Sequence, residues 1–147
     1  KIREIMTGEV KLVHPNDSLR DTAKKMKKMD IGMVPVVEED NIVGVLTDRD
    51  MVTRVIAENQ NADETAVRDA MTTDVTTIYN DQDITDASEM MKTKQIRRLV
   101  VKNRENDKLA GIVSLGDIAE AIDDPKLGGE VLEKVSEPSE PKQQKME

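Results

Sequence analysis

The sequence contains the same unit twice, and this repetition constrains the fold more than any other feature. The segment Gly44–Asp50 (GVLTDRD) returns as Gly111–Asp117 (GIVSLGD). The register extends backwards to Met6 and Met71, which stand 65 positions apart, whereas the two glycines stand 67 apart. The two additional residues fall in the polar segment 103–108, where a hairpin loop tolerates insertions. A register kept over nearly the whole unit predicts an internal duplication.

Each copy predicts the same order of elements, β-α-β-β-α, after a short helical turn over 2–6. Apolar periodicity, caps and turn residues place the first copy's elements as strand 9–13, helix 19–29, strands 33–37 and 42–46, and a helix from Thr47 to about 58. The second copy gives strand 75–78, helix 84–94, strands 99–101 and 109–113, and helix 115–122. We therefore predict an α/β (α+β) protein with a first repeat (1–60), a linker (61–65), a second repeat (66–124) and a flexible C-terminal tail (125–147), disordered beyond Ser136.

Composition limits both the core and the chemistry. Phe and Trp are absent and Tyr79 is the only aromatic residue, so the core must be aliphatic, with nine Met residues as adaptable filler. One repeat alone approaches the size at which a core becomes marginal, so we expect each repeat to cover apolar surface of the other. The absence of Cys excludes disulfides, thiolate metal sites and a Cys nucleophile.

The net charge of −8 disfavours binding to nucleic acid or to anionic membranes, because both need a basic surface. The lysine run over 24–28 is a local exception, interpreted as a solvated helix face. No apolar run approaches the ~20 residues of a membrane helix, and the first residues lack the apolar centre of a signal peptide. We expect a cytoplasmic protein.

Catalytic motifs are missing. The sequence has no Walker loop, no nucleophile with His and carboxylate partners, and no cluster of metal ligands. We therefore predict no catalytic residues, no metal and no enzymatic activity.

The repeated motif places a hydroxyl where a strand ends and a helix begins. The free N–H groups of such a helix start favour an anion. Thr47 with Asp50, and Ser114 with Asp117, also fit a capping box. The two roles can coexist, since a carboxylate can accept two hydrogen bonds from a vicinal diol while the helix attracts phosphate.

A β-α-β-β-α unit with Gly-hydrophobic-(Ser/Thr)-x-x-Asp at its last strand–helix junction resembles the CBS domain, and the pair resembles a Bateman module. No catalytic domain accompanies the pair, which is typical of a stand-alone CBS-pair protein. The resemblance implies two units packed with pseudo-twofold symmetry through three-stranded sheets. It also implies two clefts that bind AMP, ADP, ATP or S-adenosylmethionine as regulatory ligands, with no required cofactor. The alternative is a structural or oligomerisation module whose clefts stay empty.

The resemblance assigns roles residue by residue. Asp50 and Asp117 match the family's ribose-binding Asp, and Thr47 and Ser114 match its phosphate-side hydroxyl. Phosphate-binding basic residues of the family match Arg97 and Arg98 in the second repeat, and strand alternation lets at most one of them reach a given cleft. The candidate ligand-binding residues are Thr47, Arg49, Asp50, Ser114, Asp117, Arg97, Arg98, Val13, Ile78 and Ile112.

Apolar residues carry two further expectations, one for the binding site and one for the oligomeric state. The apolar members of this set, Val13, Ile78 and Ile112, can wall an adenine base or serve only the core. An apolar helix stripe formed by Met51, Val52, Val55 and Ile56 predicts a homodimer. The sequence leaves open which nucleotide binds and which protein is regulated.

Overall fold

The structure, a computed structural model, describes residues 1–122. Its strands are β1 (Met33–Glu38), β2 (Asn41–Thr47), β3 (Thr77–Tyr79), β4 (Arg98–Lys102) and β5 (Leu109–Ser114). Its helices are the 3-10 helix η1 (Ile2–Glu4), α1 (Leu19–Met29), α2 (Asp48–Met51), the π-helix η2 (Val52–Ile56), α3 (Val67–Ala70), α4 (Ile84–Lys94) and α5 (Leu115–Ala121). Helices and strands are mixed along the chain, which confirms the predicted α+β class.

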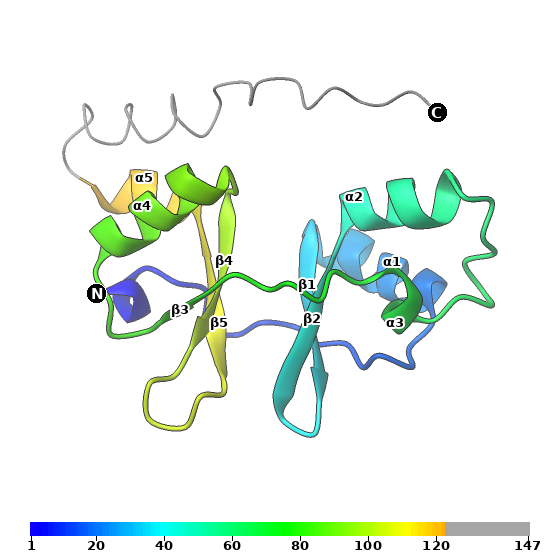
Figure 1. The fold of residues 1–147 in the computed structure, drawn as a ribbon, viewed down its shortest axis with the longest axis horizontal. Helices are drawn as coiled ribbons and strands as arrows, with labels where there is room; N and C mark the ends of the chain where they lie inside the picture. The colour runs from blue at the N-terminus through cyan, green and yellow to red at the C-terminus, as the bar shows by residue number, and fades with distance from the viewer. Residues whose placement is uncertain (123–147) are drawn as a thin grey trace. The chain divides into compact units, whose positions relative to one another are not determined.

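The described chain forms two compact units, which we name after their strands (Figure 1). The β1–β2 unit contains Glu9–Thr76 and Glu105–Leu109, and the β3–β4–β5 unit contains Lys1–Gly8, Thr77–Arg104 and, of the described residues, 110–122. The spatial units therefore differ from the sequence repeats 1–60 and 66–124: residues 1–8 of the first repeat belong to the β3–β4–β5 unit, and residues 66–76 and 105–109 of the second belong to the β1–β2 unit. The tail predicted over 125–147 lies outside the described residues.

In the β1–β2 unit the two strands pair antiparallel, with an irregularity between Val36 and Val37. The turn between them places Glu39 and Asp40 in the left-handed region, at φ 50° and 63°. Helix α1 begins at its cap Ser18, whose hydroxyl accepts the Asp21 N–H at 3.1 Å. The unit's core is aliphatic, as predicted, and its buried members are Val13, Leu19, Met26, Val34, Val36, Leu46, Val55, Val67 and Ala70.

The prediction of a strand over 9–13 is wrong. Only Val13 pairs with the sheet: its N–H donates to Pro35 O at 3.1 Å and its carbonyl accepts from Val37 N at 2.9 Å. Leu12 is 45 % exposed and Val13 is 3 % exposed, so two adjacent apolar residues face opposite environments. The segment has enough apolar character to suggest a strand, but only one of its residues has a place in the core.

The helix predicted from Thr47 to about 58 begins where expected and then changes its hydrogen bonding. After the four residues of α2 the chain forms the π-helix η2, which ends before Ala57. Of the four residues of the predicted apolar stripe, Val55 is buried in the core, Met51 is half-buried, and Val52 and Ile56 are exposed. Val55 and, packed against the same cluster, Met51 therefore serve the unit's own core.

In the β3–β4–β5 unit the short strand β3 pairs parallel with β4, and β5 lies on the other side of β4. Helix α4 has the predicted bounds, and α5 packs beside it (Figure 1). The buried core residues are Ile2, Ile78, Ala87, Met91, Leu99, Val101, Val113, Leu115 and Ile118. The predicted strand over 75–78 lies one to two residues later, at Thr77–Tyr79.

At one edge of each sheet, a residue from the start of the other repeat adds one antiparallel pair to the edge strand. Thr7 pairs antiparallel with Ile112 on β5, through N–H to carbonyl hydrogen bonds of 2.9 and 3.0 Å. Thr72 pairs in the same way with Val45 on β2, at 2.8 and 2.9 Å. Thr7 and Thr72 are equivalent positions of the duplication. In both copies, therefore, the start of one repeat pairs with the last strand of the other, and we call these two starting segments the exchanged segments.

Candidate functional site

The first motif forms at the end of β2, where Thr47 caps helix α2. The Thr47 hydroxyl accepts the Asp50 N–H at 3.0 Å, and the Asp50 carboxylate accepts the Thr47 N–H at 3.0 Å. This reciprocal pair is the predicted capping box. It fixes the side chain of Asp50 against the strand end, where the residue is only 7 % exposed.

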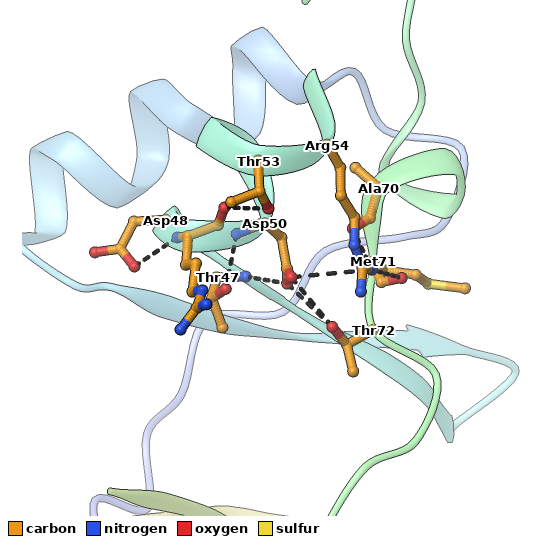
Figure 2. A network of polar contacts seen from close by, with 9 residues as sticks. Thr47, Asp48, Asp50, Thr53, Arg54, Ala70, Met71 and Thr72 are labelled. Carbon is orange, nitrogen blue, oxygen red and sulfur yellow. Dashed lines mark hydrogen bonds and ion pairs between the residues drawn. The ribbon is translucent and has the colours of Figure 1, made fainter. Parts of the chain in front are cut away.

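The Asp50 carboxylate has two further neighbours, which Figure 2 shows. The Thr72 hydroxyl lies 3.2 Å from one carboxylate oxygen and 3.3 Å from the other. Arg54 Nη1 lies 3.9 Å from Oδ1 and donates to the carbonyls of Ala70 at 3.1 Å and Met71 at 2.8 Å. We call this set, made of Asp50, Arg54, Thr72 and the two carbonyls, the Asp50 network. It joins the motif to the segment that begins the second repeat.

The second motif forms the same capping box at the end of β5. The Ser114 hydroxyl accepts the Asp117 N–H at 3.1 Å, and Asp117 Oδ2 accepts the Ser114 N–H at 2.8 Å. Asp117 is half-buried. Within residues 1–122 its carboxylate accepts no other hydrogen bond and makes no ion pair. The positions equivalent to Thr72 and Arg54 are Thr7 and Ala121. The second motif therefore has no cation in the place of Arg54.

The backbone of Arg97 contacts the second motif. The first amide of α5, Leu115 N–H, donates to the Arg97 carbonyl at 2.8 Å. In the β1–β2 unit the same place is filled by Gly32, whose carbonyl accepts the Asp48 N–H at 3.0 Å. The side chains of Arg97 and Arg98 are both exposed, and neither pairs with a carboxylate of the described chain. The second motif therefore has two guanidinium groups at the adjacent strand start, and the first has none.

The remaining predicted residues divide by burial. Arg49 is exposed directly after Thr47 and Asp48. Ile112 is half-buried on β5. Val13 and Ile78 are 3 % and 2 % exposed within the two cores, which leaves little side-chain surface for a ligand. Their role as walls of a base site stays a prediction.

Sequence reasoning chose Arg49 and missed Arg54, Thr72 and the two carbonyls that Arg54 holds. The spacing of Asp50 and Arg54 is i, i+4, which brings opposite charges together on a helix, and this signal was available. The recurrence of Met-Thr at 6–7 and 71–72 was also visible, but a repeat alone does not reveal which strand it pairs with.

Residues 1–122 contain neither a cluster of metal ligands nor a helix suited to cross a membrane. No three His, Cys, Asp or Glu residues of this part gather in a way that could hold a metal ion. None of the helices described is both long and apolar enough to cross a membrane.

Comparison with known proteins identifies the repeated unit. The family model of the CBS domain matches residues 2–57 and 67–124, so it matches most of the chain in two copies. The chain belongs to the CBS-domain family. The tandem CBS pair suggested by the repeated motif is therefore confirmed.

Relatives and solved structures agree with this assignment. The CBS domain-containing protein YhcV of Bacillus subtilis is 37 % identical over 118 residues, which cover 80 % of this CBS pair and 82 % of YhcV. The CBS domain protein TA0289 of Thermoplasma acidophilum has the same fold, with a TM-score of 0.79 at 24 % identity, covering 91 % of this chain and 75 % of that one. CBSX2, solved in complex with AMP, matches with a TM-score of 0.70 at 24 % identity, covering 82 % and 93 % of the two chains.

Proposed function

We propose that this CBS pair is a non-catalytic regulatory module that binds an adenosine-containing ligand at its Ser/Thr-x-x-Asp motifs and changes the state of a partner protein. AMP, ADP, ATP and S-adenosylmethionine are the candidate ligands. The single observation that carries the proposal is the carboxylate of Asp117, which is held by Ser114 yet keeps Oδ1 without a partner in residues 1–122.

The chemistry of the second motif suits a ribonucleotide. A carboxylate held in place by its cap can accept hydrogen bonds from the two hydroxyls of a ribose. The N–H groups at the helix start and the hydroxyl of Ser114 favour a phosphate. Arg97 or Arg98 at the adjacent strand start adds a charge that pairs with phosphate oxygens. Ribose and phosphate together define the ligand class, whereas the base would be read by aliphatic side chains and backbone groups.

The AMP bound to CBSX2 is a property of that protein. At 24 % identity its likeness to this chain establishes the fold alone. The proposed ligand class therefore rests on the motif chemistry together with membership of the CBS family.

Calorimetric titration of the Asp117→Asn variant with AMP, ATP and their 2′-deoxy forms tests the proposal. A hydrogen bond to a charged group contributes about 1.5–3 kcal/mol, so the variant should bind the ribonucleotide about 10- to 150-fold more weakly than the wild type. The wild type should also prefer the ribo form to the deoxy form, and the variant should lose this preference.

Asp86→Asn is the matched control. Asp86 is the exposed acidic partner of another capping box, with Asp83 at the start of α4, and it lies outside both motifs. Its substitution should leave nucleotide affinity unchanged. If the wild type binds none of the four ligands and no nucleotide raises its melting temperature, the nucleotide proposal is wrong.

An assembly module with empty sites is the second candidate. Its support is the exposure of two large apolar residues four positions apart on η2, Val52 at 54 % and Ile56 at 70 %. We propose that this pair forms the centre of a homodimer contact under either function. Thermal shift with nucleotides separates the two functions, because only a ligand that binds the native state raises its midpoint.

A further inference from the structure

The hydroxyl of Thr72 has a geometry that distinguishes the first motif from the second. It lies 3.2 and 3.3 Å from the two oxygens of Asp50, so its single hydrogen is shared between them. This arrangement resembles the contact that a hydroxyl of a bound ligand would make with the same carboxylate. Thr72 is half-buried and Asp50 is 7 % exposed, so little of the carboxylate is open to anything else.

The acceptor capacity of Asp50 is largely taken. Oδ2 accepts the Thr47 N–H at 3.0 Å, which the capping box requires. Arg54 Nη1 lies beside Oδ1 at 3.9 Å, and the Thr72 hydroxyl spans the remaining side of the carboxylate. A ligand hydroxyl can reach this group only by replacing one of these neighbours. Thr47 is fixed by the helix cap, so the exchangeable neighbour is Thr72.

We infer that the Thr72 hydroxyl occupies on Asp50 the place that a ligand hydroxyl would take, and that it thereby blocks ligand binding at the first motif. This inference rests on the proposed nucleotide function and adds a regulation to it. The first motif opens only when Thr72 withdraws, and the second motif needs no such step.

The rest of the Asp50 network links this step to the chain that leads into the second repeat. Thr72 is paired with Val45 by two backbone hydrogen bonds of 2.8 and 2.9 Å. Arg54 holds the two preceding carbonyls, of Ala70 and Met71. A ligand that displaces the Thr72 side chain therefore acts on a segment fixed at three successive residues. Occupancy of the first motif is coupled to the order of the segment Ala70–Thr72.

The duplication supplies an internal comparison. Thr7 is the equivalent of Thr72 and makes the same backbone pairing, with Ile112, yet its side chain is exposed and makes no hydrogen bond to Asp117 within residues 1–122. Ala121 stands in the place of Arg54. The same sequence unit thus has one motif with an internal hydroxyl on its Asp and one without.

The experiment uses AMP as the probe and Asp117→Asn as the background, so that binding at the first motif is seen alone. Adding Thr72→Val removes the hydroxyl and keeps the shape of the side chain. Calorimetry should then show about tenfold tighter binding of AMP than in Asp117→Asn itself, because the ligand no longer competes with an internal hydrogen bond. Thr7→Val in the same background should leave the affinity unchanged.

A second readout follows the segment without relying on affinity. Hydrogen exchange of the Val45 amide, which donates to the Thr72 carbonyl, should be faster in Thr72→Val than in Thr7→Val. AMP should speed this exchange in Thr7→Val, where the Thr72 hydroxyl is still present to be displaced. Unchanged or weaker AMP binding in Thr72→Val overturns the inference, as does a Val45 amide that does not respond to AMP.

Failure of the proposed function gives a different result. If the wild type and Asp117→Asn bind no AMP but Thr72→Val binds it, the blocked first motif is supported and the role of Asp117 is wrong. If no variant binds AMP, the nucleotide function and the inference both fall. Binding to the wild type that depends on Asp117, without any gain in Thr72→Val, removes the inference alone.

Discussion

Gly111 on β5 lies against the backbone of Thr7, so closely that a Cβ at position 111 would overlap the Thr7 carbonyl oxygen and come within 3.1 Å of Met6 Sδ. Gly44 on β2 stands in the same relation to the other exchanged segment, where a Cβ would come within 2.8 Å of Met71 Sδ and 2.9 Å of the Thr72 carbonyl oxygen. A glycine inside a strand often marks such a close approach of another backbone. Each motif therefore needs a glycine at this position, because the exchanged segment leaves no room for a Cβ.

Gly111→Ala should lower the free energy of unfolding by about 1–3 kcal/mol, the usual cost of forcing extra volume into a packed site. The obstacle is a backbone carbonyl, which a rotamer change cannot move away. Gly44→Ala should destabilise in the same direction. Urea denaturation of the purified variants measures both effects.

Gly116→Ala is the control for this pair. Gly116 lies in α5, where an added Cβ would make only an ordinary contact of 3.6 Å with Ser114 Oγ. Because Ala has the higher helix propensity, by about 1 kcal/mol, this variant should be as stable as the wild type or more stable. Equal stability of Gly111→Ala and Gly116→Ala would contradict the role assigned to the exchanged segment.

The local part of the fold was predictable from the sequence. The bounds of α1 and α4 follow from caps such as Ser18 and from apolar residues at helical spacing, and these signals act within a few residues. The capping boxes at Thr47 and Ser114 were predictable for the same reason. Family resemblance then placed the two motif aspartates together with their hydroxyl partners.

The part that was not predictable depends on contacts between distant residues. Thr7 pairs with Ile112, and Thr72 with Val45, so the edge of each sheet is set by a segment from the other repeat. Gly44 and Gly111 carried a signal of this close approach, but they did not name the partner. The strand expected over 9–13 failed because only Val13 finds core contacts, and local alternation cannot show which apolar residue stays exposed.

The pH dependence of stability should contain a contribution from Asp81. The hydrogen bond from Arg104, with Nε at 3.2 Å from both carboxylate oxygens, is the main cause that lowers the pKa of Asp81 below its ordinary value. Since the folded-state pKa is lowered, the resulting stabilisation is present above the unfolded pKa of about 3.9 and is lost as the pH falls through the folded value.

Asp81→Asn should therefore melt at a slightly lower temperature than the wild type at neutral pH, and the two should converge below the ordinary Asp range. The effect is small because the carboxylate lies at the surface. The variant keeps the Arg104 guanidinium over the Tyr79 ring, 3.9 Å from its centroid, so the stacking contact is not removed with the charge. Asp74→Asn, at an exposed Asp with no ion pair in the described chain, should show no such pH-dependent difference. Parallel melting curves from pH 2.5 to 7 would contradict the prediction.

The proposed homodimer contact can be tested at η2. Val52→Glu combined with Ile56→Glu places two charges on the exposed apolar pair and should convert a dimer to a monomer in light scattering, with little change in the fold. Val55 must stay unchanged because it is 4 % exposed and belongs to the core. Leu12→Glu, at another exposed apolar residue, is the control and should stay dimeric. A wild type that is monomeric at tens of micromolar, with or without nucleotide, removes the proposal.

The two arginines at the start of β4 should separate the phosphate part of the ligand from the ribose part. The Arg97 carbonyl accepts the first amide of α5, so its guanidinium starts beside the second motif, whereas Arg98 is the first residue of β4 and alternates along the strand with buried Leu99. Only one of Arg97→Gln and Arg98→Gln should therefore weaken nucleotide binding. A lost charge-assisted contact predicts about a 10-fold or greater loss of affinity for ATP, a smaller loss for AMP and none for adenosine.

The affected variant should also show a weaker dependence of affinity on salt, because one ion pair with phosphate is missing. Arg3→Gln, at an exposed Arg of the same unit, should bind all three ligands as the wild type does. Equal losses for adenosine and ATP would show that the substitution disturbs the fold of the strand start, and that neither guanidinium is a phosphate contact.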